Sequence, residues 1–208
     1  MIMTYQLDET SEIRGRDLIG ETLVLSENEC RGLIDCTFSS GTLKLAQSKR
    51  SPIILRSTVK DSDVIAVKRQ REFRFFRARF VSCRFRGVFS GIDFGHVDDT
   101  EFEEDFGAVE GCDFTGSTLD GCRFFNVEVA TLRFPRQEHA VILEPLQRAG
   151  DVAAIDWPGH LGKYMEICTN KPASLKATVL HIPSLARLLQ CTEEEIKAAF
   201  ERFGGLQM

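Results

Sequence analysis

The side chains of this sequence that could do chemistry are mainly carboxylates, and they are densest between residues 98 and 105. Paired carboxylates act as general acid and base where burial raises one pKa toward neutrality, and an exposed run lacks that burial. An exposed acidic run instead attracts a basic partner by electrostatic steering. We therefore predict no catalytic residues here, and we take the six acids of the run DDTEFEED as candidate partner-binding residues: Asp98, Asp99, Glu101, Glu103, Glu104 and Asp105.

The seven cysteines and four histidines are the other groups that could act as metal ligands or nucleophiles. No two cysteines have the C-x-x-C spacing, and an odd number does not suit a complete disulfide framework. The sequence also lacks phosphate-binding, dinucleotide-binding, H-E-x-x-H and G-x-S-x-G motifs. We predict free cysteines, no metal site, no cofactor and no enzymatic activity, and the histidines are scattered: His96, His139, His160 and His181.

Charge is distributed unevenly along the middle of the chain. Residues 68–86 contain eight Lys and Arg and a single acid, Glu72, whereas residues 87–122 contain ten acids and neither Lys nor Arg. This pattern allows two interpretations, which the sequence leaves open. The charges can pair between neighbouring segments on a solvated surface, or the acidic half can form a binding surface for a basic partner.

The elements that must position these residues are indicated by a spacing of five. Large apolar residues recur every five positions near the end of this region, mostly with a small residue two places ahead. This spacing fits neither the 3.6-residue period of a helix nor the two-residue period of a strand. It fits a solenoid whose sides are five residues long and whose turns stack about 4.8 Å apart. The inward positions are then Val109, Phe114, Leu119, Phe124, Val129 and Phe134.

The same spacing extends upstream with interruptions. It covers Ile54 to Val64 and Phe75 to Phe85, and from Ile13 to Leu43 it fails only at Asn28. Residues 44–53, 65–74 and 86–108 hold insertions that shift the phase. Charged residues occupy the small inward position near the start, where an unpaired buried charge is costly. We therefore expect the first one or two turns to be distorted, or their register to differ, around Arg16, Glu21 and Arg31.

Five segments of this region resemble the pentapeptide-repeat family: ARFVS, CRFRG, CDFTG, STLDG and CRFFN. Each has a small residue, a polar or charged one, Leu or Phe, and two further residues. The resemblance spans about residues 11–135 and implies a right-handed quadrilateral β-helix. We expect this β-helix to form one domain over residues 1–135, with the cysteines as small core residues.

Residues 136–208 are predicted to form a helical region that caps the last turn. HLGKYMEICT and PSLARLLQ have helical spacing, and EEEIKAAFERF follows a capping box formed by Thr192 and Glu195. The last two segments have the lengths and spacing of a helix-turn-helix motif. The glutamates at the start of EEEIKAAFERF, however, would repel the phosphates of DNA. The fold class is therefore mainly β, a solenoid with a C-terminal α-helical segment that does not read DNA.

Composition and charge argue against a nucleic-acid-binding or membrane-spanning protein and favour a protein that binds a partner protein. The 208-residue chain has a net charge of −5, which does not favour nucleic-acid binding, and no apolar stretch long enough to cross a bilayer. Its N-terminus lacks signal-peptide features, which favours a cytoplasmic protein. We expect a protein that masks a partner, most specifically an immunity protein that neutralises a basic toxin such as a nuclease effector. The alternative, which the family resemblance implies, is a DNA mimic that acts on DNA gyrase and is related to quinolone resistance.

Overall fold

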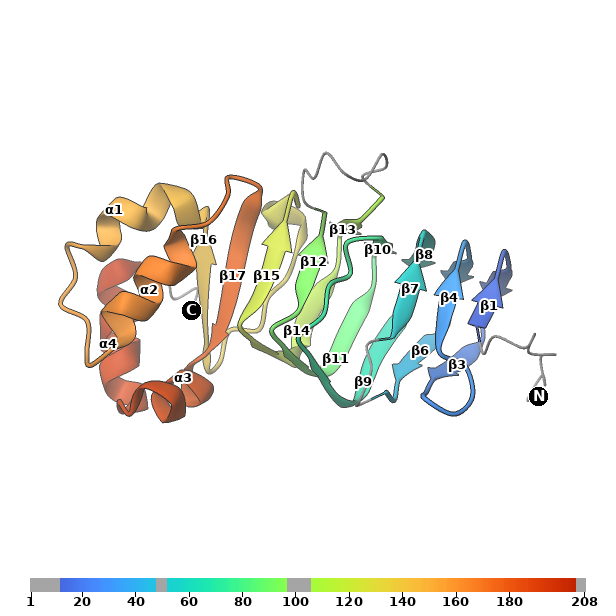
Figure 1. Cartoon of the computed structure of the whole chain (residues 1–208), viewed down its shortest axis with the longest axis horizontal. Helices are drawn as coiled ribbons and strands as arrows, with labels where there is room; N and C mark the ends of the chain where they lie inside the picture. Colours follow the sequence, from blue (N-terminus) through green and yellow to red (C-terminus); the bar gives the residue numbers. More distant parts are fainter. Residues whose placement is uncertain (1–11, 48–51, 97–105, 205–208) are drawn as a thin grey trace.

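The computed structural model describes residues 12–47, 52–96 and 106–204. Most of this part is a β-solenoid of about four turns, with β1 at one end and helices α1 to α4 at the other (Figure 1). No helix in these ranges is long and apolar enough to span a membrane.

Three parallel sheets run along the solenoid, and successive turns supply successive strands to each of them. The first sheet contains β1 (Glu12–Arg14), β4 (Gly32–Ile34) and β7 (Ile53–Leu55). The second contains β2 (Asp17–Ile19), β5 (Thr37–Ser39), β8 (Ser57–Lys60), β10 (Ala78–Val81) and β13 (Ala108–Glu110). The third contains β3 (Thr22–Leu25), β6 (Thr42–Leu45), β9 (Asp63–Arg71), β11 (Arg84–Ser90) and β14 (Asp113–Asp120).

The register of these sheets stacks the predicted inward residues in columns. In the second sheet Leu18 lies opposite Phe38, and Phe38 lies opposite Val59, so the turns are 20 and 21 residues long. Val59 is followed in the same column by Phe80 and then Val109, and all five side chains are buried. The five-residue spacing therefore identified the core positions of the second sheet correctly.

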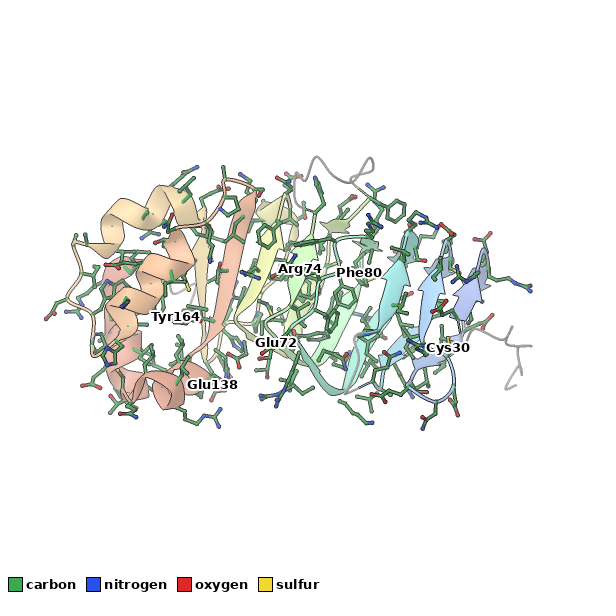
Figure 2. The ribbon with its side chains drawn as sticks, viewed as in Figure 1. Cys30, Glu72, Arg74, Phe80, Glu138 and Tyr164 are labelled. Carbon is green, nitrogen blue, oxygen red and sulfur yellow. The ribbon has the colours of Figure 1, made fainter. Side chains whose placement is uncertain are left out.

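Phenylalanine rings fill the later turns of this core. Phe85 stacks on Phe114 with ring centroids 4.4 Å apart, and Phe94 stacks on Phe124 at 5.0 Å. Edge-to-face contacts such as that between Phe80 and Phe85 join neighbouring columns. Figure 2 shows Phe80 among the side chains of the solenoid. Stacked and edge-to-face pairs are the arrangements that aromatic quadrupoles favour, which explains why Phe is suited to this repeated position.

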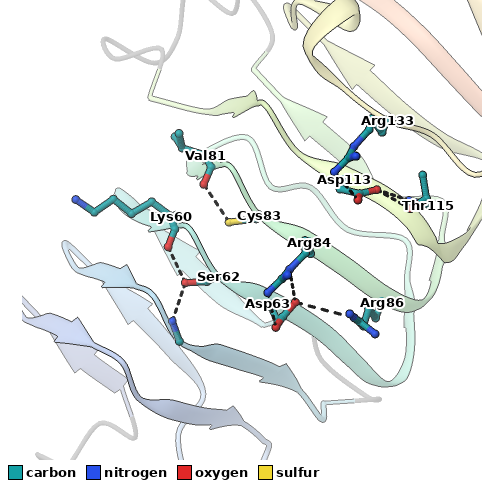
Figure 3. Close-up of polar contacts among 11 residues, drawn as sticks. Lys60, Ser62, Asp63, Val81, Cys83, Arg84, Arg86, Asp113, Thr115 and Arg133 are labelled. Carbon is teal, nitrogen blue, oxygen red and sulfur yellow. Dashed lines mark hydrogen bonds and ion pairs between the residues drawn. The ribbon is translucent and has the colours of Figure 1, made fainter.

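The small residues beside the core link one turn to the next through hydrogen bonds. Ser62 Oγ accepts a hydrogen bond from the Gly41 amide at 3.2 Å and donates to the Lys60 carbonyl at 2.6 Å (Figure 3). Cysteine does the same more weakly, since Cys83 Sγ donates to the carbonyl of Val59 in the preceding turn. All seven cysteines are free, as predicted.

The expected distortion of the first turns is wrong. Ile13, Leu18 and Leu23 are buried in regular strands, so the predicted register holds there. The charged residues at the small positions are not buried: Arg16 is exposed, and Glu21 and Arg31 are half-buried. Their charges therefore keep access to water, and the cost that motivated the expectation does not arise.

The last turn continues into a fourth sheet that contains strands the sequence did not predict. In it β12 (Asp93–Gly95) pairs in parallel with β15 (Cys122–Phe125), and β17 (Leu175–His181) pairs antiparallel with both β15 and β16 (His139–Leu143). Val141 and Val179 on one face of β16 and β17 join the solenoid core. Ile142 and Leu180 on the other face join a separate helical core. The capping element is thus a pair of strands, and the helices cover its outer face.

The predicted helices are present around that second core. They are α2 (Leu161–Thr169), α3 (Ile182–Leu189) and α4 (Glu193–Phe203). The short η2 (Pro145–Arg148) and α1 (Ala149–Val152) precede α2, and η1 (Val129–Thr131) lies before β16 against the solenoid core. The capping box is also present, because Thr192 Oγ1 accepts from the Glu195 amide while the Glu195 carboxylate accepts from the Thr192 amide. Val129 is only half-buried, since η1 replaces a strand there.

Candidate functional site

The predicted partner-binding segment belongs to the connection between β12 and β13. Its six acids, Asp98 to Asp105, lie outside the described residues. The residues on either side of it are described and lie against one another. His96 Nδ1 donates a hydrogen bond to the Gly107 carbonyl at 2.9 Å, so the described residues before and after the segment meet at one point of the solenoid.

Close backbone contacts fix that point. A Cβ on Gly107 would lie 2.2 Å from the Gly95 carbonyl oxygen and 2.3 Å from that of Phe76. Gly95 has a φ of 88°, and a Cβ there would lie 1.9 Å from the Phe125 carbonyl oxygen. Only glycine fits at either position, because real Cβ atoms do not approach backbone oxygens so closely. The acidic segment is therefore attached to a rigid, tightly packed corner.

Just before this corner, a buried carboxylate is held by arginines from other turns. Asp93 is 2% exposed, and Arg123 donates to its two oxygens over 2.6 and 2.8 Å. Arg74 approaches the same carboxylate at 3.5 Å from the preceding turn. Bidentate arginine–carboxylate pairs are strong and directional, so Asp93 locks three turns together instead of offering a free charge to a partner.

A second set of charges forms a ladder of alternating sign along the third sheet. Arg84 lies opposite both Asp63 and Asp113 in the register, and Asp113 bridges to Arg133. The ion pairs are Arg84–Asp63 at 2.9 Å and Arg133–Asp113 at 2.8 Å (Figure 3). Burial acts to raise the pKa of Asp113, but hydrogen bonds from Thr115 and the charge of Arg133 lower it more.

The ion pairs support pairing between turns for Asp93, Glu110 and Asp113, whereas Asp120 accepts a hydrogen bond from Ser90. Arg79 also bridges to Glu110 at 3.2 Å across the second sheet. Exposed pairs of this kind contribute at most about 1 kcal/mol each, so their main effect is to neutralise the surface. The charges of Asp93, Glu110 and Asp113 are thus compensated by arginine.

Among the described residues the histidines form no metal-binding cluster. His139 has a structural role. Its Nε2 accepts the Leu119 amide at 3.1 Å, and its Nδ1 donates to the Gln137 carbonyl at 2.6 Å. Burial lowers the pKa of His139, and the neighbouring His181, whose ring centroid is 5.1 Å away, lowers it further. Sequence reasoning missed this role because the contact joins β14 to β16, a strand it did not predict.

Two of the buried thiols, Cys122 and Cys168, are not poised as nucleophiles or metal ligands. Burial raises the pKa of Cys122 to about 12 and that of Cys168 to about 11. A thiol with a raised pKa carries little of the thiolate that attacks electrophiles or binds metals. Among the described residues, no cluster of His, Cys, Asp or Glu has a geometry that could hold a metal ion.

No protein-family model matches the chain, and no curated protein matches it in sequence.

Proposed function

We propose that this chain is a non-enzymatic protein-binding module that masks a partner protein in the cytoplasm. Its most specific form is an immunity protein that neutralises a basic toxin, such as a nuclease effector. We also propose that the solenoid is a right-handed quadrilateral β-helix of the pentapeptide-repeat type. Buried residues at five-residue steps, with small hydrogen-bonded residues beside them, support that assignment.

One observation carries the functional proposal. The acidic run starts and ends at a corner held by the His96–Gly107 hydrogen bond and by glycine contacts to three backbone oxygens. Segments that project from a rigid scaffold are common binding sites, because the scaffold limits the entropy lost when a partner binds. Six negative charges within eight residues would attract a basic surface over a long range.

The DNA-mimic alternative has less support from the solenoid surface. A mimic must present rows of negative charge where DNA presents phosphates. The described face of the third sheet instead alternates in sign, from Asp63 to Arg84, Asp113 and Arg133. We therefore favour a partner that contacts the acidic segment itself over one that reads the whole rod as DNA.

The proposal is tested by affinity capture from the native cell extract. The parent protein is compared with a variant that neutralises four acids of the segment: Asp98→Asn, Asp99→Asn, Glu103→Gln and Glu104→Gln. We expect the parent to retain one basic protein in a stoichiometric amount and the variant to lose it. Retention of the same protein by both would contradict the assignment of the acidic segment as the interface.

A matched control removes four exposed acids elsewhere, so that net charge changes equally: Glu128→Gln, Glu166→Gln, Glu194→Gln and Glu201→Gln. This control should retain the partner, because steering depends on where the charge lies as well as on its amount. A gyrase supercoiling assay with the purified parent separates the two functions. Masking predicts no inhibition, whereas inhibition by the parent alone would favour the DNA mimic.

A further inference from the structure

Strand β9 contains a bulge at a different corner of the solenoid. Ala66 pairs with Gly87 and Gln70 pairs with Phe89, so three residues of β9 face one residue of β11. Bulges of this kind push the extra residues out of the sheet and redirect their side chains. Here they project Val67, Lys68 and Arg69 from the surface, and all three are exposed.

The bulge is anchored from inside the solenoid. The side chain of Gln70 is buried, and its Nε2 donates to the Lys68 carbonyl at 2.8 Å. The same amide also lies within hydrogen-bonding distance of the carbonyls of Gln47 and Leu45, at 3.1 and 3.3 Å. An internal hydrogen-bond network therefore fixes the backbone of the bulge, and a partner would meet a preorganised surface.

Within the described ranges, the cations of the bulge form none of the ion pairs that other arginines of this region form. Arg74, Arg79 and Arg84 each bridge to an acid of a neighbouring turn. Among the described residues, no ion pair reaches Lys68, Arg69 or Arg71.

Arg86, on the adjacent strand, adds to this positive surface. It comes no closer than 4.0 Å to Asp63, which already binds Arg84 through both carboxylate oxygens. We call Val67, Lys68, Arg69, Arg71 and Arg86 the basic bulge.

We propose that the basic bulge docks an acidic protein segment that carries an apolar side chain. Charge complementarity selects the acidic partner, and Val67, which is 57% exposed amid cations, supplies the apolar contact. Single-stranded nucleic acid is less well matched, because its binding relies on bases stacked on aromatic rings. The large apolar side chains exposed in the described part of the chain are all aliphatic: Ile19, Val67, Leu146, Ile167 and Leu188.

This surface is separate from the point at which the acidic segment is attached, and it does not depend on the function proposed for that segment. Figure 1 places the β9 corner along the lower edge of the solenoid and the facing ends of β12 and β13 along the upper edge. The opposite signs of the two surfaces imply different partners or different regions of one partner.

The test uses two fluorescent probes of equal net charge, a synthetic peptide in which glutamate pairs alternate with valine and an oligothymidylate. Binding to each is measured by anisotropy at low and moderate salt. For the peptide we expect the Kd of Lys68→Gln/Arg69→Gln/Arg71→Gln to rise about tenfold or more, with a weaker salt dependence. A Val67→Ser variant, which keeps every charge, should raise the same Kd about threefold because it loses only the apolar contact.

A charge-matched control removes exposed cations elsewhere: Arg16→Gln, Arg136→Gln and Lys163→Gln. It should bind the peptide as the parent does, and thermal unfolding confirms that each variant is folded. The proposal is overturned if the parent does not bind the peptide, or if the triple variant binds it as tightly as the parent. Tighter binding of oligothymidylate than of the peptide, lost in the triple variant, would overturn it in favour of nucleic acid.

Discussion

The solenoid and the C-terminal segment each bury a hydrophobic core, but their paired strands are separated by different numbers of residues along the chain. In the early turns each strand pairs with the strand 20 or 21 residues later, as Leu18 does with Phe38 and Phe38 with Val59. The segment after the solenoid closes over a longer range, since Arg123 on β15 lies opposite Thr178 on β17. The solenoid repeats a pairing between strands about 20 residues apart, whereas its cap depends on the longer-range pairings of β17 with β15 and β16.

That difference makes β17 the joint between the two cores. Val179 contacts the solenoid core, and its neighbour Leu180 contacts the helical core. A strand with both faces buried transmits a loss of packing on one side to the other. We therefore expect the two regions to unfold together although their sequences follow different rules.

The largest expected effect comes from truncating a core phenylalanine in each region. Phe124→Ala and Phe200→Ala should each lower the free energy of unfolding by about 3–5 kcal/mol, because both side chains are fully buried. Unfolding is followed by far-UV circular dichroism and by the fluorescence of Trp157, which contacts Phe200 in the helical core. Coincident transitions are expected from the two probes in both variants.

Two outcomes would contradict this account of two buried cores that unfold together. A loss below about 1 kcal/mol for Phe124→Ala would show that this ring does not face a core. A Phe200→Ala variant in which the Trp157 signal melts before the circular dichroism signal would show that the helical region unfolds by itself. Phe76→Ala serves as a control with a smaller expected loss, because that ring is only half-buried.

A smaller loss of stability is expected when the N-terminal cap of α4 is removed. Thr192→Ala should cost about 1 kcal/mol, because it removes the side chain that caps α4 and accepts from the Glu195 amide. Thr192→Ser keeps the hydroxyl and should cost much less. Equal losses in chemical denaturation for the two variants would mean that the capping box contributes nothing.

The same contrast explains how much of the fold could be predicted from the sequence. Each solenoid side places one large residue inward, so the spacing from Phe114 to Phe124 identifies core positions without knowledge of their neighbours. β16 and β17 have no such signature, because both of their faces are buried: HAVIL does not alternate, and LKATVLH alternates over its first five residues only. Periodicity cannot distinguish such runs from buried helix.

The two candidate binding surfaces could likewise be predicted only in part from the sequence. The acidic run is conspicuous in the sequence, and so is the cluster of Lys and Arg before it. The sequence could not tell which of those cations are paired, because pairing depends on which residues the turns place opposite one another. Arg84 on β11 forms an ion pair with Asp63 on the adjacent strand β9. Arg69 lies on a bulge of β9, which is seen only in the register of β9 with β11.

The smallest expected effect is a pH dependence at the joint. His139 is held neutral with its folded-state pKa below the unfolded value, mainly by burial, and it faces His181, Glu138 and Asp120. Its contribution to stability is therefore complete above the unfolded pKa of about 6.5 and is lost as the pH falls toward the folded pKa. Denaturant midpoints measured between pH 8 and 5 should fall less steeply in His139→Gln than in the parent. Parallel profiles would contradict this role.

The most direct test of the central claim is the salt dependence of the rate at which the captured partner associates with this chain. The parent should associate fast at low ionic strength and slow down steeply as salt is added, because the acidic segment steers a basic surface. Neutralising Asp98, Asp99, Glu103 and Glu104 should slow association at low salt and flatten its dependence on salt. If that variant associates as fast as the parent at low salt, the acidic segment is not the interface and the account of its function is wrong.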